Sequence, residues 1–148
     1  MRLKPTESQI QCAFVEYVER KYPFLSESLI KITNEGKRSL ALGAKMKREG
    51  LRKGAADLFF SRPSVFNSPR GEVWHGLWCE VKKPGERPTK EQLRFLALQD
   101  SNNYFSFWSD NLDDIISNFE WYIDGINNDS GRDRKDFENQ CSKTRCGL

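Results

Sequence analysis

Segments with apolar residues at helical spacing alternate with short apolar runs along this chain, and this alternation limits the folds that the chain can adopt. Helical patterns span 7–22, 39–49, 89–100 and 109–123, whereas short apolar runs lie within 29–33, 56–60, 72–82 and 104–108. Apolar residues three and four positions apart share a helix face, and short apolar runs between turn residues are typical of strands. The order is helix, strand, helix, strand, strand, helix, strand, helix. It predicts one α/β domain, with a small mixed central sheet flanked by helices.

Capping residues indicate where the helices begin and end, and composition indicates where the domain ends. Thr6 is placed to cap the first helix, and Thr89 with Gln92 matches a capping box at the start of the third. Gly50 is expected to end the basic helix in a left-handed conformation. Residues 124–148 hold five acidic and five basic residues with few apolar ones. We therefore expect a domain at 1–123 and a polar tail at 124–148 that is disordered or weakly docked.

Several classes of protein are disfavoured by composition. No run of about 18 apolar residues exists, so no membrane span is expected. The first residues lack an apolar signal core, which favours an intracellular chain. Cys12 and Cys79 lie in apolar patterns and are expected to be buried, whereas Cys141 and Cys146 lie in the tail. Without a CxxC pair, and with His75 as the sole histidine, a zinc site is disfavoured.

Positive charge is concentrated in one segment. Residues 37–53 contain seven lysines or arginines and one glutamate, so they carry +6 in a chain of net charge +3. A basic strip on an otherwise slightly acidic protein favours a polyanionic partner such as DNA, although a solvated helix face is the alternative. Such contacts would hold the phosphate backbone without reading its sequence. Gly54, just before the next predicted strand, would let the protein backbone approach a phosphate closely. The candidate DNA-binding residues are Asn34, Lys37, Arg38, Lys45, Lys47, Arg48, Arg52 and Lys53.

The run Glu80-Val81-Lys82-Lys83 places charges at the end of an apolar strand pattern. Residues two apart in a strand point to the same face, so Glu80 and Lys82 project together while Val81 points into the core. Asp57 lies on another predicted strand. If the two strands are adjacent, Asp57 and Glu80 can share a divalent cation, and Mg²⁺ prefers such carboxylate ligands.

This arrangement suits phosphodiester hydrolysis. The metal would polarise a phosphoryl oxygen and lower the pKa of a bound water. Lys82 would orient that water or stabilise the charge on the phosphorane. The alternative is that Glu80 and Lys82 form an ordinary ion pair on a solvent-facing strand.

Taken together, these residues resemble the PD-(D/E)xK nuclease signature and, more closely, the VRR-NUC family of virus-type replication-repair nucleases. The resemblance runs through "ESQIQCAFVEYV", "NEGKRSLALGAKMKREGLRKGAADLFF" and "GLWCEVKKPGERPTKEQLRFL" and covers about 6–122. It implies a restriction-endonuclease-like core. The family usually has proline where this chain has Ala56, and proline there supplies no ligand, so activity is expected to survive.

The resemblance also implies roles for individual residues. Asp57, Glu80 and Glu7 correspond to the metal-site acids, with Val81 among the metal-site residues. Lys82 corresponds to the catalytic lysine, and Gln92 to a glutamine that supports the site. Gln11, one helical turn after Glu7, is expected to approach the site as well. The implied cofactor is Mg²⁺, with Mn²⁺ as a substitute.

The resulting hypothesis is a metal-dependent DNA endonuclease. Stand-alone members of the family resemble Holliday-junction resolvases, which favours a homodimer acting on branched DNA in replication, repair or recombination. The resemblance also favours a cytoplasmic location in a bacterial or phage-infected cell. Flap cleavage or nicking is the nearest alternative activity. A non-catalytic DNA-binding module that retains the nuclease fold, and a protein-interaction domain, are the other hypotheses.

Overall fold

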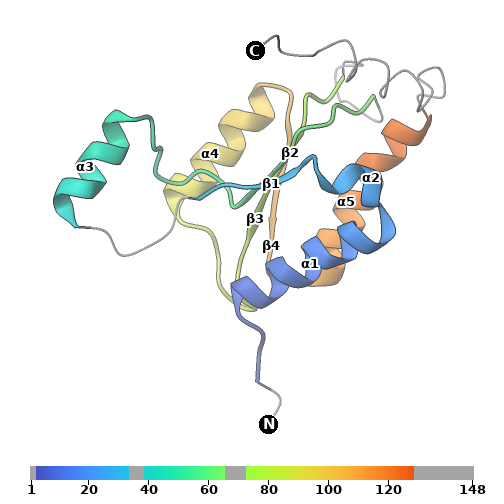
Figure 1. Cartoon of the computed structure of the whole chain (residues 1–148), viewed down its shortest axis with the longest axis horizontal. Helices are drawn as coiled ribbons and strands as arrows, with labels where there is room; N and C mark the ends of the chain where they lie inside the picture. The colour runs from blue at the N-terminus through green and yellow to red at the C-terminus, as the bar shows by residue number, and fades with distance from the viewer. Residues whose placement is uncertain (1–2, 34–38, 66–72, 129–148) are drawn as a thin grey trace, which may run out of the picture.

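The chain folds around a four-stranded sheet with helices on both faces. The computed structural model describes residues 3–33, 39–65 and 73–128 (Figure 1). In chain order the elements are α1 (Glu7–Lys21), α2 (Pro23–Ser26), β1 (Leu29–Lys31), α3 (Leu40–Arg48), β2 (Leu58–Phe60), β3 (Leu77–Val81), α4 (Lys90–Ser101), β4 (Phe105–Ser109) and α5 (Leu112–Asn128). The α/β class predicted from the sequence is confirmed.

The sheet is mixed, as expected, and its strands lie in sequence order. β1 pairs with β2 and β2 with β3 in antiparallel fashion, whereas β3 and β4 are parallel. Parallel neighbours need a long crossover, and α4 supplies it between β3 and β4. Because β2 and β3 are neighbours, the condition under which Asp57 and Glu80 lie close together is met.

Alternating side chains divide the sheet into two apolar faces. Helices α1 and α5 cover one face and α4 lies against the other (Figure 1). On the α4 face, the Trp78 ring lies 4.5 Å from the Phe59 ring and 5.0 Å from the Phe95 ring, measured between centroids. The larger core lies on the α1 and α5 face and includes Ile10, Phe14, Val18, Leu58, Phe60, Leu77, Cys79, Val81, Ile115, Phe119, Tyr122 and Ile123. This core holds the N-terminus of α1 and the end of β3 in fixed relation.

Several elements differ from their predicted bounds. For 72–82 the sequence predicted a strand, or a turn followed by a strand; in the structure β3 begins at Leu77, and Trp74 makes an isolated bridge with Ser64. Helix α5 continues past Ile123 to Asn128, and residues 129–148 lie outside the described residues. Cys79 is buried as expected. Cys12 is exposed, so its predicted burial was wrong.

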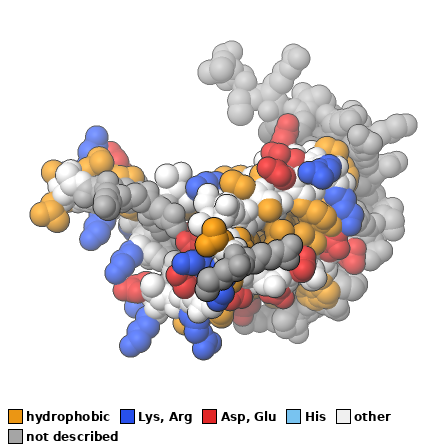
Figure 2. Space-filling model, turned by 90° about the horizontal axis from the view of Figure 1, so that it is seen from below, with side chains coloured by type: hydrophobic (Ala, Val, Ile, Leu, Met, Phe, Trp, Pro, Cys, Tyr) orange, Lys and Arg blue, Asp and Glu red, His pale blue; other side chains and the backbone are white. Residues whose placement is uncertain are grey.

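Helix α3 stands away from the sheet (Figure 1). Ser39 caps its N-terminus, and none of its residues is buried. Leu40 is 96% exposed, and Figure 2 shows hydrophobic side chains beside lysine and arginine on this projecting helix. Gly50, which follows the helix, has φ 104°, so its predicted left-handed conformation is confirmed.

Within the described ranges, no helix is long and apolar enough to cross a membrane.

Candidate active site

Strand pairing brings the predicted acids to one end of the sheet. Leu58 of β2 lies opposite Cys79 of β3, so Asp57, just before β2, lies near Glu80 and Val81. The Asp57 carboxylate accepts a hydrogen bond from the Val81 backbone N–H at 2.8 Å. The Asp57 carbonyl accepts another from the Ile32 N–H, also at 2.8 Å. Asp57 is thus held by the strands on both of its sides.

Glu80 and Lys82 form a buried ion pair. The Lys82 Nζ lies 2.8 Å from Glu80 Oε1, and the two side chains are 10% and 1% exposed. Charged side chains are seldom buried without a partner or a function, so this low exposure excludes a solvent-facing placement of the pair, while its catalytic role stays a prediction. The alternative of an ion pair on a solvent-facing strand was wrong.

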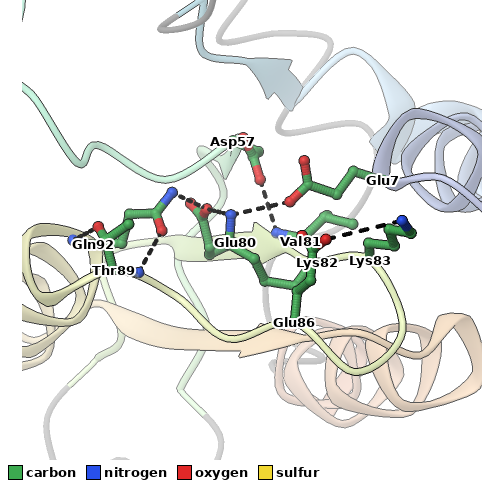
Figure 3. Close-up of polar contacts among 9 residues, drawn as sticks. All are labelled: Glu7, Asp57, Glu80, Val81, Lys82, Lys83, Glu86, Thr89 and Gln92. Carbon is green, nitrogen blue, oxygen red and sulfur yellow. Dashed lines mark hydrogen bonds and ion pairs between the residues drawn. The ribbon is translucent and has the colours of Figure 1, made fainter.

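Glu7 reaches the same lysine from the first turn of α1. Thr6 caps this helix by accepting from the Gln9 N–H, and the Gln9 side chain accepts from the Thr6 N–H. This capping box fixes where α1 begins and therefore where Glu7 projects. The Glu7 Oε1 lies 3.0 Å from Lys82 Nζ, so Lys82 lies between two carboxylates (Figure 3).

Gln92 uses both ends of its amide. Its Oε1 accepts from the Thr89 N–H at 2.8 Å, which completes the predicted capping box of α4. Its Nε2 donates to Glu80 Oε1 (Figure 3). The same side chain therefore caps α4 and donates a hydrogen bond to Glu80.

The two carboxylate oxygens of Glu80 differ in their hydrogen bonding. Glu80 Oε2 is buried and has no hydrogen-bond partner among the described residues. Burial raises the pKa of Glu80 to about 7; the hydrogen bond from Lys82 opposes this rise and the negative charge of Asp57 adds to it. Burial alone would lower the pKa of Lys82, but its hydrogen bonds to Glu80 and Glu7 raise it above its ordinary value. Lys82 therefore remains charged at neutral pH.

The carboxylates of the site include candidate ligands for a divalent cation. Among the described residues, no group of three or more His, Cys, Asp or Glu side chains is placed so that it could hold a metal ion. Lys82 instead lies between Glu7 and Glu80. Nevertheless, Glu80 Oε2 is a buried carboxyl oxygen without a partner among the described residues, and Asp57 and Glu7 supply further carboxylates nearby (Figure 3). Hard oxygen donors of this kind are those that Mg²⁺ prefers.

A solvent-open pocket adjoins these residues. It has a volume of about 430 Å³ and is lined by Thr6, Glu7, Ser8, Gln11, Lys31, Asp57, Lys83 and Glu86. Gln11 lines this pocket together with Glu7 and Asp57. Lys31, Lys83 and Glu86 were not predicted. Lys83 could have been noticed beside Lys82, whereas Lys31 depends on the β1–β2 register.

The predicted DNA-binding residues lie apart from this centre or outside the described residues. Asn34, Lys37 and Arg38 are outside them. Lys45, Lys47 and Arg48 are exposed on α3, and Arg52 is exposed in the loop that follows. Lys53 forms an ion pair with Glu91 of α4 at 3.0 Å. Both readings of the basic segment, a DNA contact and a solvated helix face, remain compatible with this placement.

Gly54 has a different role from the one expected. The sequence suggested that it lets a phosphate approach the backbone. Instead, a Cβ at Gly54 would lie 2.7 Å from the Glu91 carbonyl carbon and 3.0 Å from the Gln92 nitrogen, and φ is +85°. The missing side chain therefore lets the loop before Asp57 lie against the backbone of α4, which carries Gln92.

The raised pKa of Glu80 predicts a pH-dependent stability. Its folded-state pKa of about 7 exceeds the ordinary 4.5, so the folded chain binds this proton more tightly than the unfolded chain. Without metal, we expect the free energy of unfolding to fall as the pH rises from about 4.5 to about 7. The contribution is on the order of 3 kcal/mol.

Urea denaturation in EDTA across this pH range measures the effect. Glu80→Gln should remove this part of the slope, whereas the exposed Glu19→Gln on α1 should keep it. An unchanged slope in Glu80→Gln would show that Glu80 is not the titrating group.

The fold has a solved counterpart. A structure described as a VRR_NUC domain protein matches with a TM-score of 0.68 and 22% sequence identity. The match covers 82% of this chain and 91% of that chain. No protein-family model matches the sequence, and no curated protein matches it significantly. At this identity the likeness establishes the fold, and it confirms the predicted restriction-endonuclease-like architecture.

Proposed function

We propose that the chain is a metal-dependent DNA endonuclease of the VRR-NUC family. The shared fold and the sequence resemblance support the family, and the site supports the activity. The observation that carries the proposal is Glu80 Oε2, a buried carboxylate oxygen without a hydrogen-bond partner among the described residues. Leaving such a group unpaired costs stability unless it has a ligand, and cationic metals are suitable ligands for it.

Glu7, Asp57, Glu80 and Val81 are the residues that would hold the cation, which is Mg²⁺ with Mn²⁺ as a substitute. When bound, it would polarise a phosphoryl oxygen and lower the pKa of a water molecule. Gln92 donates to Glu80 Oε1, and this contact holds the carboxylate in an orientation that leaves Oε2 without a partner among the described residues. The Val81 N–H holds Asp57 in the same way.

Lys82 supplies the positive charge of the site. Its ammonium is almost buried and stays protonated, because Glu7 and Glu80 both accept from it. A fixed charge in a position shielded from water stabilises negative charge that develops on a phosphorane. Lys82 also neutralises part of the repulsion between the two carboxylates and a phosphate.

Branched DNA is the proposed substrate class. The exposed cations of α3 would supply contacts to phosphates, and such contacts follow the backbone of the DNA rather than its base sequence. A two-fold homodimer would present two such sites to opposed strands of a junction. Holliday junctions are the favoured substrate, with flaps as the nearest alternative.

A cleavage assay tests this proposal. End-labelled four-way junction, flap and linear duplex DNA would be incubated with the chain in Mg²⁺, Mn²⁺ or EDTA. We expect cutting in either metal, none in EDTA, and the fastest cutting of the junction. Salt-sensitive binding without cutting in any metal would instead support a non-catalytic DNA-binding module. Absence of both binding and cutting would contradict both functions.

A further inference from the structure

The second lysine of the Glu80-Val81-Lys82-Lys83 run is not explained by the acidic centre. Lys82 is paired with Glu7 and Glu80, whereas Lys83 lines the adjoining pocket. The Lys83 side chain is 50% exposed, and its Nζ is 4.0 Å from Glu86, which is long for an ion pair. Its charge is therefore largely available to a ligand.

A lysine from a different strand lines the same pocket. Lys31 ends β1 and lies opposite Leu58 of β2, so it is adjacent to Asp57 across the sheet. The Ile32 N–H donates to the Asp57 carbonyl, which fixes the end of β1 against the acid. The pocket thus has Asp57 in its wall together with a lysine from β1 and a lysine from the turn after β3.

The two lysines bring the charge of this pocket close to neutral. Its acidic residues are Glu7, Asp57 and Glu86, which would repel a phosphate. Lys31 and Lys83 offset most of that charge, and a cation at the site would make the pocket positive. The polar side chains of Thr6 and Ser8 complete a lining suited to a hydrated anion rather than to an apolar ligand.

We propose that Lys31 and Lys83 are positioning residues that hold DNA phosphates next to the one that is cleaved. The inference rests on the proposed nuclease function and specifies where the backbone enters the site. Both lysines lie within the same pocket as Asp57 and Glu7, so a strand held by them passes beside the acidic centre. Lys82 is excluded from this role because its ammonium is already engaged by two carboxylates.

Binding and cleavage of a labelled four-way junction test the two lysines. Lys31→Met, Lys83→Met and the double variant would be compared with Lys90→Met, an exposed lysine at the start of α4 that does not line the pocket. Affinity would be measured in EDTA and in Mg²⁺, on a Glu80→Gln background that prevents cleavage. Turnover would be measured separately with Glu80 intact.

Each of the two single pocket variants is expected to weaken binding about five-fold and to reduce the slope of log affinity against log salt by about 0.9. The cleavage rate at saturating DNA should change less than about two-fold, because the lysines hold the backbone without touching the reacting atoms. Lys83→Arg should retain binding, and Lys90→Met should match the parent.

Three outcomes separate this inference from the proposed function. Cleavage by the parent with unaltered binding in both pocket variants would overturn the inference and leave the nuclease intact. Weaker binding in these variants, with no cleavage by the parent in any metal, would support the phosphate contacts and overturn the nuclease. A parent that does not bind DNA would overturn both.

Discussion

Lys82→Met is expected to lower the rate of DNA cleavage by about 10³-fold while leaving DNA bound. Methionine keeps much of the length of the side chain and removes the charge that lies 2.8 Å from Glu80 and 3.0 Å from Glu7. Glu80 should then take up a proton, because its pKa is already raised to about 7 by burial. The chain is therefore expected to remain folded at neutral pH.

Single-turnover cleavage at saturating DNA is the measurement, with circular dichroism to confirm folding. Lys90→Met is the matched control, because Lys90 is exposed on α4 and lines no part of the pocket. If Lys82→Met cleaves within about ten-fold of the unaltered chain, Lys82 is a structural ion-pair partner only.

Gly54→Ala is expected to cost about 3 kcal/mol of unfolding free energy. A left-handed φ costs a non-glycine residue about 1–2 kcal/mol, and the new Cβ would collide with backbone atoms that cannot rotate away. The loop or the start of α4 must shift. Because Gln92 lies at that point of α4 and donates to Glu80, cleavage should also fall, by about ten-fold.

Urea denaturation and the cleavage assay together test this expectation. Gly43→Ala is the control, because a Cβ added at Gly43 of α3 would meet no atom within 4 Å, and the variant should become slightly more stable. A Gly54→Ala chain as stable as the parent would show that the loop and α4 are not packed in this way.

Features that depend only on residues close together in the sequence, such as helix caps, could be predicted. Thr89 and Gln92 are three residues apart, so their capping box could be read directly and was confirmed. The left-handed Gly50 follows from the same kind of local rule. Cys12 was placed wrongly because it lies two positions from both Ile10 and Phe14, and a helix turns such a residue away from their buried face.

Contacts between segments that are far apart in the sequence could not be predicted from such local patterns. The closeness of Asp57 and Glu80 required the assumption that their strands pair, and the β2–β3 register supplies that pairing. The meeting of Glu7 and Lys82 depends on how α1 packs on the sheet. Gly54 was misread because its neighbour is the start of α4, nearly forty residues later in the chain. The metal, DNA and dimer remain predictions.

We propose that the acids around Lys82 hold a metal that the chain uses to cut DNA. The most direct test is cleavage of labelled four-way junction DNA by the unaltered chain and by Asp57→Asn, each in Mg²⁺ and in EDTA, with the exposed Asp100→Asn as the control. We predict cutting by the unaltered and control chains in Mg²⁺ only, and none by Asp57→Asn. Equal cutting by Asp57→Asn, or cutting that persists in EDTA, would contradict the claim.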